Sequence, residues 1–216
     1  MLMTSIAAAW RGAWQRPPFR VRFFVTLPLL GLMLALLAVY LLWVEQRPGV
    51  VVQDPVLKAL PLADLTWVIF GLIYGALVIG VAALVRDPDR LLLASLSYSL
   101  MVAFRIVAMY LLPLDPPVPT IPLQDPFVQL FGPGNVLMRD LFFSGHTSTL
   151  FLLFLTARRG KLRLFFLLCT IVVVAAILVH HTHYAVDVYI APFVTYTSYR
   201  LALLLTGHVD PAAPSP

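Results

Sequence analysis

The sequence predicts an all-α polytopic membrane protein, with six transmembrane helices in one bundle and both termini in the cytoplasm. Of its 216 residues, 61% are hydrophobic and only 12% are charged, about half the charged fraction of a typical soluble domain. The apolar residues form runs of about 20 residues, which is the length a helix needs to cross a bilayer. Short charged clusters separate these runs, as they do in multi-pass membrane proteins.

The apolar runs define the expected organisation of the chain. We expect a cytoplasmic or interfacial segment over residues 1–22, a six-span membrane domain over 23–206 and a C-terminal tail over 207–216. The six spans are predicted, in chain order, at residues 23–44, 65–85, 91–112, 141–157, 164–179 and 184–205. The first segment combines tryptophans with arginines, which is typical of a helix at an anionic membrane surface.

The basic residues predict how the chain is oriented. Most Lys and Arg residues lie in the N-terminal segment and in the connections after the second and fourth spans, whereas the opposite side has only Arg47, Lys58 and Arg139. The positive-inside rule therefore places the fourth and sixth spans with their first residues outside. The charges lie beside span ends rather than in a stripe with interleaved aromatics, which argues against a nucleic-acid partner.

Two polar segments lie at this external end, at residues 140–147 and 180–187. Ionisable groups beside membrane spans are costly, so they are functional candidates. His183 and Asp187 are four residues apart and share one helix face. The carboxylate would accept a hydrogen bond from one ring nitrogen and leave the other free to attack or to take a proton. His146, in the other segment, is suited to protonating a leaving oxygen.

Other residues suit the binding of an anion such as phosphate, which helix N-termini favour. Ser144 would cap the fourth span or donate to a phosphate oxygen, and Gly145 would allow close approach of the backbone. Arg105 and Arg139 are the candidate cations, since arginine matches phosphate geometry. Arginines at this depth also contact lipid head groups without any further role.

Several assignments stay open at this level. Asp140 would orient His146 or support Arg139, and Tyr110 is either a site residue or an interface anchor. The histidines and the aspartate of the second segment are also zinc ligands in principle. The sequence has no H-E-x-x-H motif and a single cysteine, Cys169, so we expect neither a metal nor a cofactor.

The two polar segments resemble the signature motifs of the sphingomyelin synthase family, part of the type 2 phosphatidic acid phosphatase superfamily. The resemblance rests on residues 144–147 (Ser-Gly-His-Thr) preceded by Asp140, and on 183–188 (His-Tyr-Ala-Val-Asp-Val). His181 fits the family's histidine two positions before the catalytic one. Residues 61–64 (Pro-Leu-Ala-Asp) and 105–110 (Arg-Ile-Val-Ala-Met-Tyr) are similar to two further family motifs.

The resemblance implies a catalytic triad of His146, His183 and Asp187. His183 would form a phosphorylated intermediate, and His146 would protonate the leaving alcohol. It also implies a set of substrate-binding residues: Arg105, Ser144, Gly145, Asp140, Tyr110, His181 and Arg139. The expected partners are a phospholipid donor, a lipid hydroxyl or water as acceptor, and the bilayer itself.

The implied activity is transfer of a phospho-headgroup or cleavage of a phosphodiester, with the site on the periplasmic side of a bacterial inner membrane. The first alternative is a lipid phosphate phosphatase. The chain lacks the Lys-x6-Arg-Pro motif of that class and the Ser-Arg before its second histidine, which favours the sphingomyelin synthase branch. The second alternative is a non-enzymatic lipid-binding or transport protein.

Overall fold

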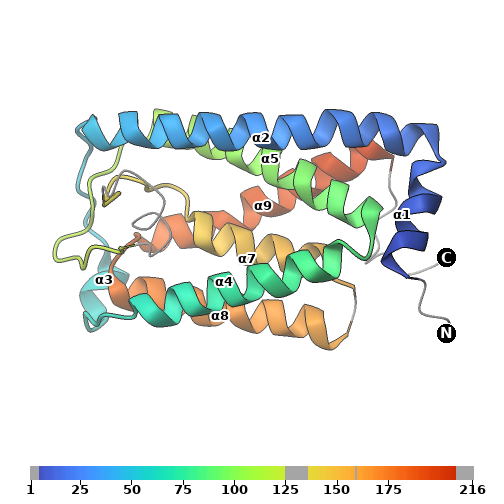
Figure 1. The fold of residues 1–216 in the computed structure, drawn as a ribbon. Coiled ribbons are helices and arrows are strands. Elements are labelled where there is room, and N and C mark those ends of the chain that lie inside the picture. The colour runs from blue at the N-terminus through green and yellow to red at the C-terminus, as the bar shows by residue number, and fades with distance from the viewer. Residues whose placement is uncertain (1–4, 125–135, 159, 208–216) are drawn as a thin grey trace.

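A computed structural model of the protein describes residues 5–124, 136–158 and 160–207. These residues form an all-α bundle (Figure 1). The helices are α1 (Ile6–Trp14), α2 (Pro17–Gln46), α3 (Pro55–Ala59), α4 (Thr66–Leu84), α5 (Pro88–Leu111), α7 (Gly145–Thr156), α8 (Lys161–His180) and α9 (Ala185–Thr206). The predicted helical class is confirmed for the part of the chain that is described.

Five of these helices are long and apolar enough to cross a membrane: α2, α4, α5, α8 and α9. They run along one common direction, with α3 at one end of the bundle and α1 at the other (Figure 1). We call these the α3 end and the α1 end. Helix α2 packs on α5, α5 packs on α9, and α7 packs against both α8 and α9. The central α7 is therefore surrounded by longer helices.

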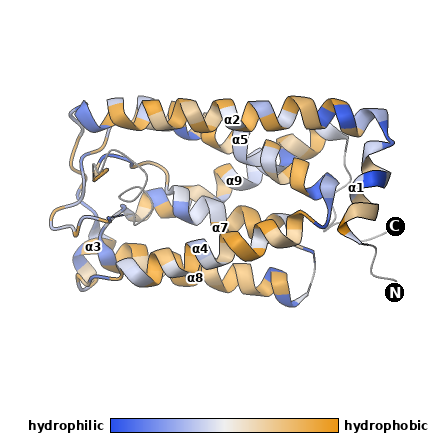
Figure 2. Cartoon of the chain, in the orientation of Figure 1, coloured by the Kyte–Doolittle hydropathy of each residue, from blue (hydrophilic) through white to orange (hydrophobic). Residues whose placement is uncertain are grey.

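The outer faces of the long helices are apolar. Residues such as Trp67 and Leu204 are 79% and 73% exposed, and the hydropathy colouring shows apolar residues along most of α2, α4 and α8 (Figure 2). Large exposed apolar surfaces are unfavourable in water and natural in a bilayer. Several apolar helices thus indicate a multi-pass membrane protein.

The predicted fourth span is shorter than expected. Helix α7 begins only at Gly145 and has 12 residues, which is about 18 Å of helix against a hydrocarbon core of about 30 Å. Residues 141–144, the first four of the predicted span, lie outside the helix, and Ser144 caps it through its side chain. The total of six spans and the cytoplasmic termini stay predictions.

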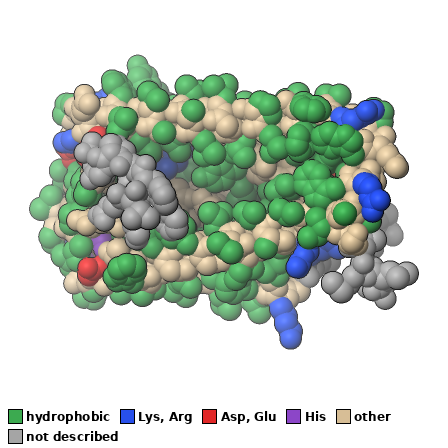
Figure 3. Space-filling view, in the orientation of Figure 1, with side chains coloured by type: hydrophobic (Ala, Val, Ile, Leu, Met, Phe, Trp, Pro, Cys, Tyr) green, Lys and Arg blue, Asp and Glu red, His purple; other side chains and the backbone are tan. Residues whose placement is uncertain are grey.

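The N-terminal segment packs against the bundle. The Trp10 indole nitrogen donates to the Val85 carbonyl oxygen at 2.8 Å, and Arg16 pairs with Asp89 at 2.7 Å. Helix α2 already begins at Pro17, six residues before the predicted span, because proline is favoured in the first turn of a helix. In the view of Figure 3, most of the visible Lys and Arg side chains lie towards the α1 end.

The connections at the α3 end carry the polar segments. Residue Val50 pairs with Leu114 in a short parallel bridge, with hydrogen bonds of 3.1 Å from the Val50 nitrogen to the Pro113 carbonyl and from the Asp115 nitrogen to the Val50 carbonyl. This bridge joins the segment after α2 to the segment after α5. The first residues of α7 and α9 lie at the same end (Figure 1).

Candidate active site

His183 and Asp187 form a buried pair at the start of α9. The His183 Nδ1 and Asp187 Oδ2 atoms are 3.3 Å apart, and the two residues are 2% and 0% exposed. A carboxylate only accepts hydrogen bonds, so Nδ1 carries the proton and Nε2 keeps its lone pair. Asp187 Oδ2 also accepts from the Tyr184 nitrogen at 3.2 Å, which caps α9. The sequence spacing thus brings the pair together as predicted.

His146 faces this pair from the first turn of α7. The ring centroids of His146 and His183 are 6.3 Å apart, and the rings are inclined by 65°. The Ser144 nitrogen donates to the Asp187 carbonyl oxygen at 3.2 Å, so the two polar segments are joined directly. The Ser144 hydroxyl accepts from the Thr147 nitrogen at 3.4 Å, as the predicted cap requires. Two histidines from separate segments are therefore opposed at one site.

Arg105 reaches the start of α7 from α5. Its Nη2 atom lies 2.6 Å from Asp140 Oδ1, and its Nε donates to the Phe143 carbonyl oxygen at 2.9 Å. A Cβ atom on Gly145 would lie 2.7 Å from the Arg105 Nη1 atom. The glycine therefore lets the guanidinium lie against the helix start. Asp140 was predicted to orient His146 or to support Arg139. In the structure it pairs with Arg105 instead of Arg139.

We expect Gly145→Ala to lower turnover about 10-fold and stability by roughly 1–3 kcal/mol, as overpacking does. Arg105 is 7% exposed, and its guanidinium is held by Phe143 and Asp140, so it cannot move aside cheaply. Gly71→Ala is the matched control, because nothing lies within 4 Å of its Cβ position. Turnover and thermal midpoints of both variants test this. Wild-type turnover in Gly145→Ala would mean that catalysis does not need Arg105 at this place.

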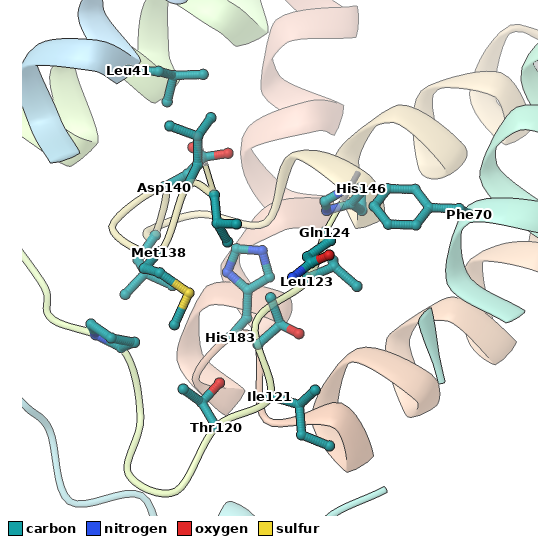
Figure 4. Close-up of a pocket in the computed structure, with 15 residues that line it drawn as sticks. Leu41, Phe70, Thr120, Ile121, Leu123, Gln124, Met138, Asp140, His146 and His183 are labelled. Carbon is teal, nitrogen blue, oxygen red and sulfur yellow. The ribbon is translucent and has the colours of Figure 1, made fainter. Parts of the chain in front are cut away.

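A cavity of about 210 Å³ connects the two histidines (Figure 4). Most of its lining is apolar, including Leu41 from α2 and Phe70 from α4. Its polar lining consists of Thr120, Gln124, Asp140, His146, Thr182 and His183. No Lys or Arg is among the described residues that line it. The site thus combines an apolar chamber with two histidines and one carboxylate.

Three predicted substrate-binding residues lie elsewhere. Tyr110 is 58% exposed and stacks on Trp43, with ring centroids 6.4 Å apart. Arg139 Nε pairs with Asp115 Oδ1 at 2.6 Å. His181 ends α8 in the left-handed conformation, with φ of 57°, and its Nδ1 lies 3.2 Å from the Pro119 carbonyl oxygen. None of the three lines the cavity, and neither do Arg105, Ser144 and Gly145. Of the predicted substrate-binding residues only Asp140 lines it, and the substrate contacts of the others stay predictions.

His180 connects two helices instead of facing the cavity. Its Nε2 lies 3.1 Å from the Thr66 hydroxyl, and its Nδ1 lies 2.7 Å from the Thr182 hydroxyl. Asp64 is 3.5 Å from the same Nε2, and the hydrogen bond from the Thr66 backbone nitrogen lowers the pKa of that carboxyl. Within the described ranges, no three His, Cys, Asp or Glu side chains are placed to share a metal ion.

Two residues at the site had no predicted role in it: Tyr184, which was considered only as an interface anchor within the second motif, and Asp54. The Tyr184 hydroxyl donates to the Asp115 carbonyl oxygen at 2.8 Å, and burial raises the pKa of this tyrosine. Asp54 Oδ2 accepts from the Ala185 nitrogen at 2.6 Å. The pair Asp54-Pro55 is a helix-start signal, and it correctly marks α3. Its partner in α9 has no signal in the sequence.

The fold and this site define a helical membrane protein with a buried His–Asp pair facing a second histidine. Residues 139–203 match the family described as PAP2 superfamily C-terminal. No curated protein and no solved structure matches the chain. The matched residues include both polar segments, all of α7 and α8, and α9 as far as residue 203. The match supports the type 2 phosphatidic acid phosphatase superfamily, whose members are phosphatases or phosphotransferases, and it thereby supports an enzyme.

Proposed function

We propose that this protein acts on phospholipid head groups through a phospho-histidine intermediate, in the manner of the sphingomyelin synthases. The observation that carries the proposal is the buried His183–Asp187 pair, which faces His146 across one cavity. This arrangement supplies a nucleophile, a group that orients it and a general acid. The apolar lining suits the glycerol and chain region of a membrane lipid.

In the first half-reaction, His183 Nε2 attacks phosphorus, and an N–P bond forms as the bond to the lipid oxygen breaks. His146 gives its proton to that oxygen, which leaves as an alcohol. Asp187 stabilises the positive charge on the His183 ring through Nδ1–H. Arg105 and the amides at the start of α7 would stabilise charge on the phosphate oxygens.

In the second half-reaction, His146 takes the proton of the acceptor hydroxyl. The acceptor oxygen then attacks phosphorus, the N–P bond breaks, and His183 returns to its starting state. A lipid hydroxyl as acceptor gives headgroup transfer, whereas water gives phosphodiester cleavage. The same groups serve both directions, so the choice depends on which acceptor enters the cavity.

The charges around the cavity favour a phosphodiester donor. A phosphomonoester carries about −1.5 to −2 charge at neutral pH, whereas a diester carries one negative charge. The described lining has no Lys or Arg. Arg105 contributes one positive charge beside the start of α7, and the carboxylate of Asp140 pairs with it. A site with so little net positive charge suits the smaller charge of the diester.

The second candidate is a lipid phosphatase, because the matched superfamily includes phosphatases as well as phosphotransferases. In that case water would be the acceptor, and the substrate would be a phosphomonoester such as phosphatidate. The histidine chemistry is the same, so the two candidates differ in the donor and in the range of acceptors.

A lipid turnover assay on purified protein in detergent distinguishes them. The substrates are phosphatidate, phosphatidylcholine and phosphatidylethanolamine, each with and without ceramide or diacylglycerol. We expect a new phospholipid, or released diacylglycerol, from a diester donor, and loss of both in His183→Ala. Free phosphate from phosphatidate, lost in the same variant, would identify a phosphatase. No turnover by well-folded protein would favour lipid binding or transport.

A further inference from the structure

The segment between α2 and α3 contributes a buried carboxylate to the start of α9. Asp54 is 9% exposed. Its Oδ1 atom accepts from the Val56 nitrogen at 2.8 Å and from the Leu57 nitrogen at 3.3 Å. Its Oδ2 atom accepts from the Ala185 nitrogen at 2.6 Å. One carboxylate therefore caps α3 and also binds a helix 131 positions further along the chain.

The bound amide lies inside the catalytic turn. Ala185 is the first residue of α9 and stands between His183 and Asp187. The preceding amide, that of Tyr184, is bound by Asp187 itself at 3.2 Å. Two successive amides of this turn are thus fixed by two carboxylates, one from within the helix and one from the α2–α3 segment.

The α2–α3 segment is itself anchored. Val50 pairs with Leu114 in the bridge described above, and the Val52 nitrogen donates to the Tyr184 hydroxyl at 3.1 Å. A Cβ atom on Gly49 would overlap the backbone of Leu114, so the two segments are in close contact. Asp54 therefore binds the start of α9 from a segment that is itself held in place by the Val50–Leu114 bridge and the Val52–Tyr184 hydrogen bond.

We propose that Asp54 is a positioning residue, which sets the geometry of the His183–Asp187 pair by holding the Ala185 amide. The 3.3 Å separation of His183 Nδ1 and Asp187 Oδ2 lies just beyond the usual range for a hydrogen bond. A small shift of the start of α9 would break this hydrogen bond, and the ring proton of His183 would then no longer be fixed on Nδ1. The catalytic part of this inference rests on the function proposed above.

Asp54→Asn tests the inference with almost no change in shape. One amide oxygen still caps α3, while the NH₂ group faces the Ala185 N–H, donor against donor. We expect kcat to fall about 10- to 100-fold, as it does when a catalytic group is slightly misplaced, with KM within about 3-fold of wild type. Asp54→Ser keeps a cap for α3 without the second oxygen, and we expect the same split between kcat and KM.

Asp87→Asn is the matched control. Asp87 caps α5 by accepting from the Arg90 nitrogen at 3.4 Å, and its second oxygen pairs with Arg158 at 2.8 Å. It thus has the same double role at the other end of the bundle. Wild-type kcat in this variant, beside a reduced kcat in Asp54→Asn, supports positioning rather than a general effect of losing a capping carboxylate.

The imidazole Nδ1–H resonance of His183 gives a readout that does not need turnover. It is assigned by its loss in Asp187→Asn. We expect it to shift or broaden in both Asp54 variants and to stay unchanged in Asp87→Asn. If the resonance and kcat are unaltered in the Asp54 variants, the inference is wrong. If the resonance responds but the wild type turns over no lipid, the proposed function fails while the positioning role stands.

Discussion

Replacement of His183 by alanine is expected to reduce turnover of the lipid donor by at least about 10⁴-fold, the scale of losing a catalytic nucleophile. Among the described residues, His183 is the histidine that both lines the cavity and has a buried carboxylate beside its Nδ1 atom. The measurement is the initial rate of head-group release from the donor that turns over, in detergent.

The control for this variant is chemical rescue. The deleted ring leaves space in the cavity, so added imidazole is expected to restore part of the rate and to carry the phosphorylated group away. Thermal midpoints of the variant and wild type show that both are folded. A folded His183→Ala protein with more than a tenth of wild-type turnover would rule out His183 as the nucleophile.

Replacement of His146 by alanine is expected to have the second largest effect, and one that depends on the leaving group. A general acid contributes about 10²- to 10⁴-fold when the leaving oxygen is a poor one, as in a glycerolipid. A nitrophenyl phosphodiester needs no such proton. In single-turnover release of the leaving group, which precedes the base role of His146 in the second half-reaction, we therefore expect a loss of about 10³-fold with the lipid and less than about 10-fold with the nitrophenyl substrate.

The comparison of the two substrates separates proton transfer from folding, because a misfolded protein would lose both activities. Equal losses with both substrates would show that His146 binds or supports the substrate and does not protonate the leaving alcohol. Its place in the first turn of α7, with its ring 6.3 Å from that of His183, is compatible with proton transfer to an oxygen held between them.

The long helices could be predicted because apolar runs bounded by charged residues fix both length and ends. The third span was predicted at 91–112 and forms α5, Pro88–Leu111. The His183–Asp187 contact could also be predicted from the sequence, since residues four apart lie on the same face of a helix. Local periodicity therefore accounts for most of the fold and for the central pair.

What the sequence did not predict depends on contacts between distant segments. Asp140 was predicted to orient His146 or to support Arg139, and only the packing of α5 against α7 shows that it is in contact with Arg105. The shortness of α7 follows from a cap by Ser144 within an otherwise apolar run. The second contact of Asp54 joins the start of α3 to the start of α9, and no sequence motif links these two helix starts.

The most direct test of the account is to trap the intermediate. Donor lipid labelled on the phosphate is mixed with the protein without an acceptor, and the protein is quenched in base and sequenced by mass spectrometry. We predict an adduct on His183 that is stable in base and labile in acid, absent in His183→Ala and reduced in Asp187→Asn. Continued turnover with no adduct, or an adduct on another residue, would contradict the central claim.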